Sequence, residues 1–239
     1  MPTGNDASPL AAKRRARKIN RLLGELYPYA VAELDFANAF ELLIATVLSA
    51  QTTDVRVNSV TPVLFARYPD ARALAEANEE ELQELIRPTG FFRAKSAAIK
   101  KLATQIVDDY DGEVPNKLDE LVKLAGVGRK TANVVLGNAF GVPGMTVDTH
   151  FLRLSRRFGW TESKDPVKVE QDVAELFEPK DWTPLSNRVV FHGRRVCHAK
   201  KPACGACAVA QLCPSYGEGE TDPDKARKLL KYELAPGRE

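Results

Sequence analysis

Residues 124–132 read LAGVGRKTA, and this stretch decides the kind of fold that the sequence predicts. Gly126 and Gly128 enclose one valine, and helical periodicity lies on both sides of them. Because glycine adopts positive φ without steric cost, a very tight turn can join the two helices. The backbone N–H groups of such a turn, and of the helix N-terminus that follows it, suit a phosphate. The stretch therefore predicts a helical hairpin that binds an anion.

Lys130 begins the second helix of this hairpin on the side opposite the predicted core. The core side follows the i, i+3, i+4, i+7 rule and consists of Ala132, Val135, Leu136 and Ala139. The positive end of the helix macrodipole favours a neutral amine at this position, and the neutral amine is the nucleophilic form. A lysine that only contacts a phosphate fits the same position, so the residues alone leave both roles open.

Helical periodicity extends along most of the chain, and strand signals are nearly absent. The stretch 40–50 (FELLIATVLSA) is apolar almost all round and predicts a helix inside a core. We therefore expect an all-α fold. The other predicted helices lie near residues 54–67, 70–87, 94–110, 118–124, 129–140, 148–158, 167–177 and 185–196. Residues 1–12 and 215–239 are predicted to be flexible.

The four cysteines of the chain lie within 17 residues, spaced C-x6-C-x2-C-x5-C, at Cys197, Cys204, Cys207 and Cys213. Disulfides are disfavoured, because no signal peptide is recognisable and an intracellular chain keeps its thiols reduced. Structural zinc usually pairs two C-x2-C knuckles, and only one is present. Iron–sulfur clusters also take four thiolates from compact loops. The spacing favours an iron–sulfur cluster over zinc but leaves zinc open.

Charge is segregated along the chain although the net charge is only +2. One basic cluster comprises Lys13, Arg14, Arg15, Arg17, Lys18 and Arg21. A second comprises Arg188, Arg194, Arg195, Lys200 and Lys201, with no acidic residue between Asn187 and Cys207. A basic face can follow a phosphate backbone, although a solvated surface helix explains the N-terminal cluster equally well. No run approaches the roughly 18 apolar residues of a membrane span, so no membrane is expected.

Asp148 lies in the stretch 146–150 (TVDTH), directly before a predicted helix. Aspartate is a common N-cap residue, so a purely structural role is one interpretation. A short return loop after the helix that begins near Lys130 can also bring the carboxylate back to that lysine, which leaves a catalytic role open.

Together these stretches resemble the endonuclease III family, bifunctional DNA glycosylases and AP lyases of the helix–hairpin–helix superfamily. The resemblance runs from about residue 17 to Cys213. It rests on residues 48–54 (LSAQTTD), 126–135 (GVGRKTANVV), 147–150 (VDTH), 192–194 (HGR) and the four cysteines. One departure is Ala125, where the family usually has proline, so we expect a somewhat less rigid hairpin.

The resemblance implies two helical lobes that flank a DNA-binding cleft. One lobe, residues 32–142, is a six-helix barrel with the helix–hairpin–helix at about 115–140. The other joins residues 1–31 to residues 143–239 and holds a [4Fe-4S] cluster on the four cysteines.

The resemblance also implies base-excision repair of oxidised pyrimidines, such as thymine glycol, in duplex DNA. Lys130 attacks C1′ of the deoxyribose, displaces the base and forms a Schiff base, and β-elimination then breaks the strand. Asp148 assists Lys130 and stabilises the cationic sugar. Gln51 enters the gap left by the flipped base. Phe91 or Phe92 supplies an apolar wedge, and core packing is the alternative role for these two phenylalanines. The remaining expected DNA contacts are Gly126, Gly128, Arg129, His150, Arg194, Arg195, Lys200 and Lys201.

The expected partner is duplex DNA with a damaged pyrimidine or an abasic site, and the expected protein is a monomer in the bacterial cytoplasm, associated with the nucleoid. Three rival interpretations remain. An adenine-mismatch glycosylase is disfavoured by Lys130 and by the chain's end at residue 239. A non-catalytic DNA-binding module is disfavoured by the pairing of Lys130 with Asp148. A ferredoxin-like electron carrier is disfavoured by the large helical body and the basic surface.

Overall fold

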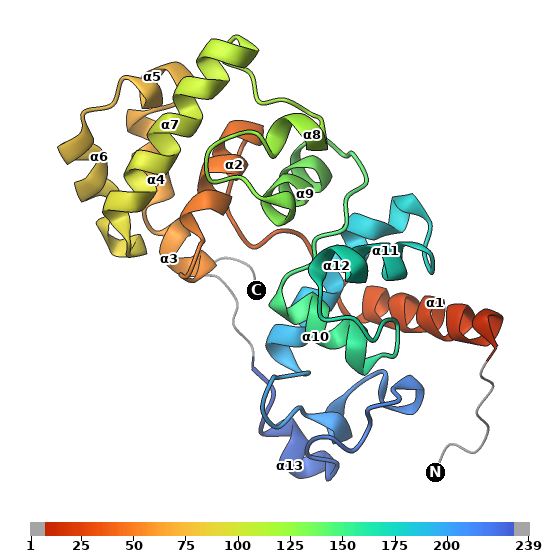
Figure 1. The fold of residues 1–239 in the computed structure, drawn as a ribbon. Coiled ribbons are helices and arrows are strands. Elements are labelled where there is room, and N and C mark those ends of the chain that lie inside the picture. The colour runs from red at the N-terminus through yellow and green to blue at the C-terminus, as the bar shows by residue number, and fades with distance from the viewer. Residues whose placement is uncertain (1–7, 232–239) are drawn as a thin grey trace. The chain divides into compact units, whose positions relative to one another are not determined.

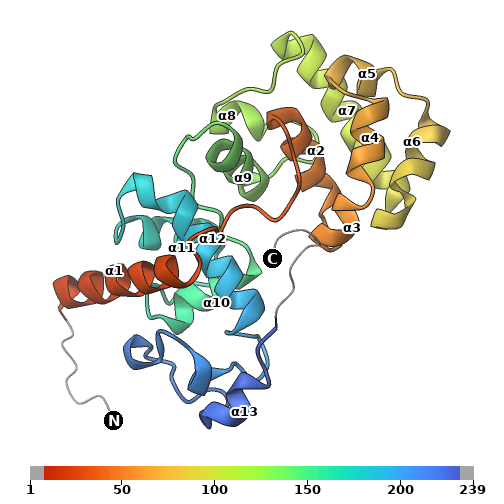
Figure 2. The ribbon, with the colours of Figure 1, turned by 180° about the vertical axis from the view of Figure 1, so that it is seen from behind.

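The computed structural model describes residues 8–231, and every regular element in that range is a helix (Figures 1 and 2). The predicted all-α class is confirmed. The chain divides into two compact units, one formed by Ala32–Val142 and the other by Met1–Val31 together with Pro143–Glu239. No helix within residues 8–231 is long and apolar enough to cross a membrane.

The unit of residues 32–142 is built around α2 (Ala39–Leu48), in which every residue from Leu42 to Leu48 is buried. Asn38 caps this helix by accepting a hydrogen bond from the N–H of Glu41, and the Glu41 carboxylate accepts one from Ala37. Both α7 (Phe92–Tyr110) and α9 (Arg129–Ala139) pack against α2, so the core helix supports the second helix of the hairpin. The other elements are α3 (Asp54–Asn58), α4 (Thr61–Arg67), α5 (Ala71–Ala75), α6 (Glu79–Ile86), η1 (Arg87–Thr89), α7 (Phe92–Tyr110), α8 (Leu118–Leu121) and α9 (Arg129–Ala139).

The second unit buries side chains from both ends of the described chain in one core. Ile19 and Leu23 of the first helix share this core with Phe151, Leu154 and Phe158. Helix α12 (Pro179–Arg195) packs against both α1 (Pro9–Leu26) and α10 (Thr149–Arg157). The elements are α1 (Pro9–Leu26), α10 (Thr149–Arg157), α11 (Pro166–Ala174), α12 (Pro179–Arg195), η2 (Cys204–Ala206), η3 (Ala210–Leu212) and α13 (Pro223–Arg227).

The two terminal segments for which flexibility is predicted contain regular structure over their described residues. Helix α1 begins at Pro9, and the Ser8 hydroxyl caps it by accepting from the N–H of Ala11. Residues 215–231 fold back on the cysteine loop, where Ala226 is fully buried with Val196 and Ala203. The segment is rich in charged residues, so its composition did not indicate that its few apolar side chains form a small core with the cysteine loop. Residues 1–7 and 232–239 lie outside the described range.

Two helix boundaries also differ from the prediction. The helix predicted over residues 54–67 is two helices, α3 and α4, and Pro62 lies at the start of the second. Proline is favoured there because the first turn of a helix leaves its N–H groups unbonded. Helix α12 begins at Pro179, six residues before the predicted start at Leu185, and contains Pro184.

Candidate active site and cysteine cavity

The hairpin turn exposes backbone at the start of α9. Gly126 has φ +75°, the left-handed region that favours glycine. Gly128 is the N-cap of α9, and a Cβ at this position would meet nothing within 4 Å. No side chain caps α9, whereas Asn38, Thr53, Asp70 and Asn78 cap other helices of this unit. The first turn of α9 therefore presents N–H groups at open backbone, as an anion site requires.

Ala125 is bonded to helix α7 in a way that a proline could not be. Its N–H donates to Oε1 of Gln105 at 2.7 Å. Since proline has no N–H, this hydrogen bond requires a residue other than proline at position 125. Gln105 thus ties the turn to α7, and nothing in its local sequence indicated that role.

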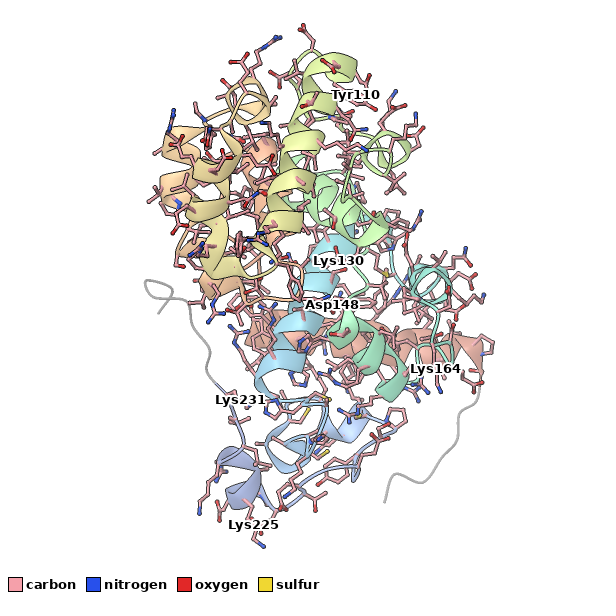
Figure 3. All side chains as sticks on the ribbon, turned by 60° about the vertical axis from the view of Figure 1, so that its left-hand side comes forward. Tyr110, Lys130, Asp148, Lys164, Lys225 and Lys231 are labelled. Atoms are coloured by element: carbon pink, nitrogen blue, oxygen red, sulfur yellow. The ribbon has the colours of Figure 1, made fainter. Side chains whose placement is uncertain are left out.

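Lys130 is exposed in the first turn of α9 (Figure 3). The opposite face of the helix buries Ala132, Val135 and Leu136, as the periodicity predicted. The predicted placement of this lysine outside the core is confirmed.

Asp148 is the N-cap of α10, and its Oδ1 accepts from the N–H of Phe151 at 2.7 Å. The structural interpretation of this residue is therefore confirmed. Lys130 belongs to the unit of residues 32–142 and Asp148 to the other unit, so their approach is part of the function proposed below.

Backbone strain coincides with three of the expected DNA contacts. Among residues 8–231, the non-glycine residues with positive φ are Gln51 (56°), Phe91 (48°), Asp111 (53°) and Lys201 (51°). Asp111 ends α7, a common place for this conformation. The other three side chains are exposed. Left-handed backbone at non-glycine residues is costly and concentrates at functional sites.

The structure distinguishes the two phenylalanines that follow Gly90. Phe92 packs against the core, and the guanidinium carbons of Arg87 and Arg93 lie 5.3 and 5.7 Å from its ring centroid. The Phe91 side chain is 67% exposed. Core packing is therefore confirmed for Phe92, and Phe91 remains the candidate wedge.

The expected basic contacts occupy different environments. Arg129, Lys200 and Lys201 are exposed and Arg194 is half-buried. Arg195 is only 7% exposed, and its guanidinium carbon lies 4.1 Å from the Phe191 ring centroid. Arg195 therefore offers a phosphate backbone less surface than the other basic residues do, and its contact with DNA stays a prediction.

His150, another expected contact, is half-buried against α12. A Cβ at position 193 would lie 2.9 Å from the His150 Cβ, so only glycine fits beside this ring. Burial lowers the pKa of His150, the nearby Arg153 and Arg194 lower it further, and Asp148 opposes them.

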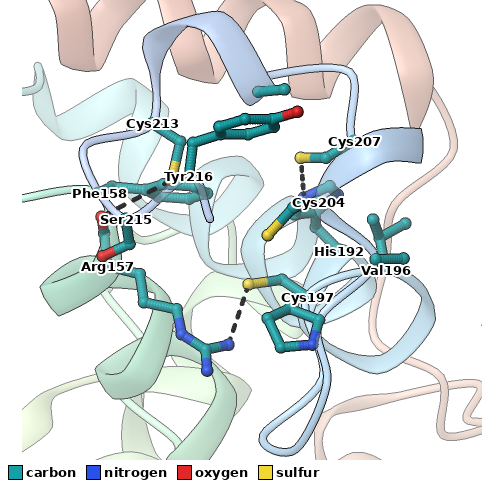
Figure 4. Close-up of a pocket in the computed structure, with 13 residues that line it drawn as sticks. Arg157, Phe158, His192, Val196, Cys197, Cys204, Cys207, Cys213, Ser215 and Tyr216 are labelled. Carbon is teal, nitrogen blue, oxygen red and sulfur yellow. Dashed lines mark hydrogen bonds between the residues drawn. The ribbon is translucent and has the colours of Figure 1, made fainter. Parts of the chain in front are cut away.

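All four cysteines line one cavity, and Figure 4 shows their sulfur atoms turned toward a shared space. None forms a disulfide. Burial raises the pKa of Cys207 to about 12 and that of Cys213 to about 11. Buried thiolates therefore need a strong positive partner, which a metal centre provides. Within the described chain, no three His, Cys, Asp or Glu side chains are placed to hold one metal ion. The four thiols around one cavity are a donor set that fits a thiolate-bound metal centre.

Two arginines that were not predicted hold the cysteine loop through its carbonyl groups. Arg153 Nη2 donates to the carbonyls of Gly193 (3.1 Å) and Cys197 (2.9 Å). Arg157 Nη1 donates to the carbonyl of His198 (2.7 Å) and to Sγ of Cys197 (3.3 Å). Their i, i+4 spacing on α10 was the available sequence signal, since it places both side chains on one helix face.

His192 is a further unpredicted support of the cavity. Its Nε2 lies 3.3 Å from Sγ of Cys207 and its Nδ1 lies 3.1 Å from the Tyr27 hydroxyl. Full burial lowers its pKa to about 4, so the ring is neutral. A neutral ring can donate at one nitrogen and accept at the other, which matches the two partners.

The segment after Cys213 closes over the loop through glycine contacts. Gly205 N–H donates to the carbonyl of Glu220 (2.8 Å), and Glu220 N–H donates to that of Pro202 (2.9 Å). A Cβ on Gly205 would collide with the Thr221 carbonyl, and one on Gly219 with the Pro202 carbonyl. Only glycine permits this close approach of the two backbones.

Known proteins match the chain over most of its length. The sequence profile described as HhH-GPD superfamily base excision DNA repair protein matches residues 44–179. Endonuclease III of Synechocystis sp. is 52% identical over 204 residues, covering 85% of this chain and 93% of the relative. Endonuclease III of Bacillus subtilis is 46% identical over 192 residues, covering 80% and 88%.

Solved structures agree. A structure described as a non-covalent endonuclease III–DNA complex has a TM-score of 0.81 and 43% identity, covering 85% of this chain and 95% of the other. A thermostable thymine-DNA glycosylase, at 21% identity and a TM-score of 0.80, shares the fold. The chain therefore belongs to the HhH-GPD superfamily of base excision DNA repair proteins and, within it, to the endonuclease III family.

Proposed function

We propose that the chain is a base-excision repair glycosylase that releases oxidised pyrimidines from duplex DNA and then cleaves the strand at the abasic sugar. The observation that carries this proposal is the exposed Lys130 in the uncapped first turn of α9, beside open backbone at Gly128. A phosphate bound to that turn brings the deoxyribose of a flipped nucleotide near the lysine amine.

Binding begins with the backbone of the damaged strand at the hairpin. Gly126 and Gly128 let the phosphate approach, while Arg129, Arg194, Lys200 and Lys201 add positive charge. Gln51 fills the space that the flipped base leaves, and Phe91 wedges between neighbouring bases. Both project from left-handed backbone and both are exposed, which supports these roles.

The chemistry then proceeds through the lysine amine. The Lys130 nitrogen forms a bond to C1′, the glycosidic bond breaks, and the base leaves with the bonding electrons and a proton. The sugar ring opens to a Schiff base, a proton leaves C2′, and the C3′–oxygen bond breaks with departure of the 3′ phosphate. Asp148 accepts the proton that the lysine nitrogen loses, passes it to the departing base, and stabilises positive charge on the sugar. His150, two residues further on, contacts the same strand. Water finally hydrolyses the Schiff base, which frees the Lys130 amine and the cleaved sugar.

The cysteine cavity is proposed to hold a [4Fe-4S] cluster on Cys197, Cys204, Cys207 and Cys213. A cluster supplies four metal–thiolate bonds that fix the loop, and at this site it has no step in the reaction. The support is the donor set: four thiols around one cavity, with Arg157 and His192 hydrogen-bonded to two of them. The loop so formed carries Lys200 and Lys201.

Borohydride trapping tests the proposed chemistry. The native chain, Lys130→Ala and the matched control Lys123→Ala are incubated with a duplex that contains one thymine glycol. Lys123 is an exposed lysine of the same hairpin, paired with Glu120 at 3.1 Å. We expect a covalent adduct with the native chain and the control, and none with Lys130→Ala. No adduct with the native chain, together with base release that survives in Lys130→Ala, would instead indicate a monofunctional enzyme. No adduct and no base release would favour the binding module or a different lesion.

The partner, assembly and location follow from this function. We propose a monomer that binds duplex DNA with a damaged pyrimidine or an abasic site and is associated with the bacterial nucleoid. Light scattering of the purified chain with and without such a duplex measures the assembly. Binding that weakens steeply with salt is expected of a phosphate-binding protein, and a dimeric complex would contradict the monomer.

A further inference from the structure

The loop between η1 and α7 holds Phe91 in a conformation that phenylalanine does not adopt by preference. Gly90 (φ 70°) and Phe91 (φ 48°) both have positive φ, one directly after the other. The ring of Phe91 is 67% exposed, so no core contact keeps it there. Left-handed backbone at a bulky residue persists only where the surrounding structure imposes it.

Lys95, in the first turn of α7, fixes this loop on both sides of Gly90. Its side-chain Nζ donates to the carbonyl of Thr89 at 2.8 Å, and its backbone N–H donates to the carbonyl of Phe91 at 3.0 Å. Thr89 is itself 1% exposed, and its hydroxyl donates to the carbonyl of Ile86 at 2.7 Å. One residue therefore holds the carbonyls that flank the two left-handed positions.

The burial of a charged side chain at Lys95 indicates that its hydrogen bond to the Thr89 carbonyl has a function. The residue is only 6% exposed, and burial lowers its pKa. A methionine would fill similar space without the cost of burying an ammonium group. The charge is useful only to a group that needs a strong donor, and the group it bonds is the Thr89 carbonyl.

We propose that Lys95 is a positioning residue that holds Phe91 in its projecting conformation, ready to enter the base stack when the damaged nucleotide flips out. This inference rests on the proposed function and deepens it. Lys95 touches neither DNA nor the reacting atoms, and it acts through Phe91. It therefore matters for extrusion of a base and much less at an abasic site, where no base has to be unstacked.

A double-mutant cycle tests the inference, using Lys95→Met, Phe91→Ala and the pair. Loss of a buried hydrogen bond to a charged donor predicts about a tenfold slower single-turnover release of thymine glycol by Lys95→Met. The double variant should be no slower than Phe91→Ala, because Lys95 has nothing left to position. Cleavage of a duplex with a preformed abasic site should change by less than about twofold in Lys95→Met, because no base has to be unstacked there.

Lys100→Met is the matched control. Lys100 lies on the same helix, and its Nζ donates to the carbonyl of Ala77 at 2.6 Å, in a different loop. This variant should release thymine glycol at the native rate. Where Lys95→Met melts below the assay temperature, Lys95→Gln, which keeps an N–H donor, takes its place and should lie between the native chain and Phe91→Ala.

Native-rate base release by Lys95→Met overturns the inference, as do losses that multiply in the double variant. A DNA-free measurement separates it from the proposed function. With fluorophenylalanine at position 91, the fluorine NMR signal should be single and sharp in the native chain and shifted or broadened in Lys95→Met. An unchanged signal overturns the positioning role even if the native chain proves to release no base.

Discussion

The helical hairpin and the cysteine loop are both short connections that carry the residues of the proposed function, yet different forces hold them. Side chains of α7 support the hairpin, which lies against α2 and the apolar core. The cysteine loop places Val209 in the main core of its unit and shares a small second core with residues 215–231, and it is also held by arginine–carbonyl bonds and close glycine contacts around its buried thiols. We therefore expect the hairpin to depend mainly on apolar burial, and the cysteine loop to depend on the proposed metal centre as well.

The largest expected effect comes from removing one thiol ligand. Cys207→Ser should lower the stability of the cysteine loop by at least about 3 kcal/mol, because metal binding and folding of such a loop are coupled. Hydrogen exchange should show lost protection in residues 196–231 and retained protection in α2 and α9. Ala208 is an exposed neighbour in the same loop, and Ala208→Ser is the control. It should change neither the stability of the loop nor its protection from hydrogen exchange. An equal loss of protection in residues 196–231 and in α2 and α9 would show that the two regions do not differ in what stabilises them.

The close backbone contact at Gly219 tests what stabilises the cysteine loop without changing a proposed metal ligand. Gly219→Ala should destabilise the protein by roughly 2–3 kcal/mol, since the added Cβ forces apart two backbones that touch. Gly217→Ala is the control in the same segment: its Cβ meets nothing within 4 Å, and only its φ of +104° opposes the change. Chemical denaturation with cluster absorbance as the probe measures both. If the two variants lose the same stability, the close approach is not what holds the segment.

In the hairpin, a double-mutant cycle of Gln105→Leu and Ala125→Pro isolates the hydrogen bond between Gln105 and Ala125. Gln105→Leu should cost about 1–2 kcal/mol in the native chain, because it leaves the Ala125 N–H without its partner. In an Ala125→Pro background the same change should cost almost nothing, since proline has no N–H to satisfy. Urea denaturation of the four proteins gives the coupling. Additive costs would show that Gln105 acts elsewhere.

The smallest effect concerns the first hairpin helix. The Tyr110 hydroxyl donates to Glu120 Oε2 at 2.6 Å, which raises the pKa of Tyr110 to about 12 and lowers that of Glu120. A raised tyrosine pKa stabilises the fold below its ordinary value of 10.0 and stops doing so as pH rises toward 12. A lowered glutamate pKa stabilises the fold above its ordinary 4.5 and stops doing so as pH falls further.

Tyr110→Phe should therefore be less stable than the native chain mainly between pH 4.5 and 10, and the difference should shrink on either side. Urea denaturation across this range measures it. Tyr216 is an exposed tyrosine in the other compact unit, and Tyr216→Phe serves as the control. Its stability should follow that of the native chain across the pH range. A difference that is flat with pH would mean that packing of the ring, and not the hydrogen bond, is responsible.

The sequence predicted features that depend on neighbouring residues. The buried helix α2, the exposed Lys130 and the Asp148 cap all follow from local periodicity and capping. Other features depend on distant partners and escaped prediction. Phe91 and Phe92 are adjacent and chemically alike, and only the fold determines which one is buried. Arg195 is removed from the surface by the Phe191 ring, and residues 215–231 become ordered through contacts with the cysteine loop.

The account depends most on the lysine at the start of α9. After borohydride treatment of the native chain with thymine glycol duplex, the adduct is digested and the modified peptide is identified by mass spectrometry. The account predicts that the reduced sugar is attached to Nζ of Lys130. Attachment to another lysine, or a trapped adduct of equal yield in Lys130→Ala, would contradict it.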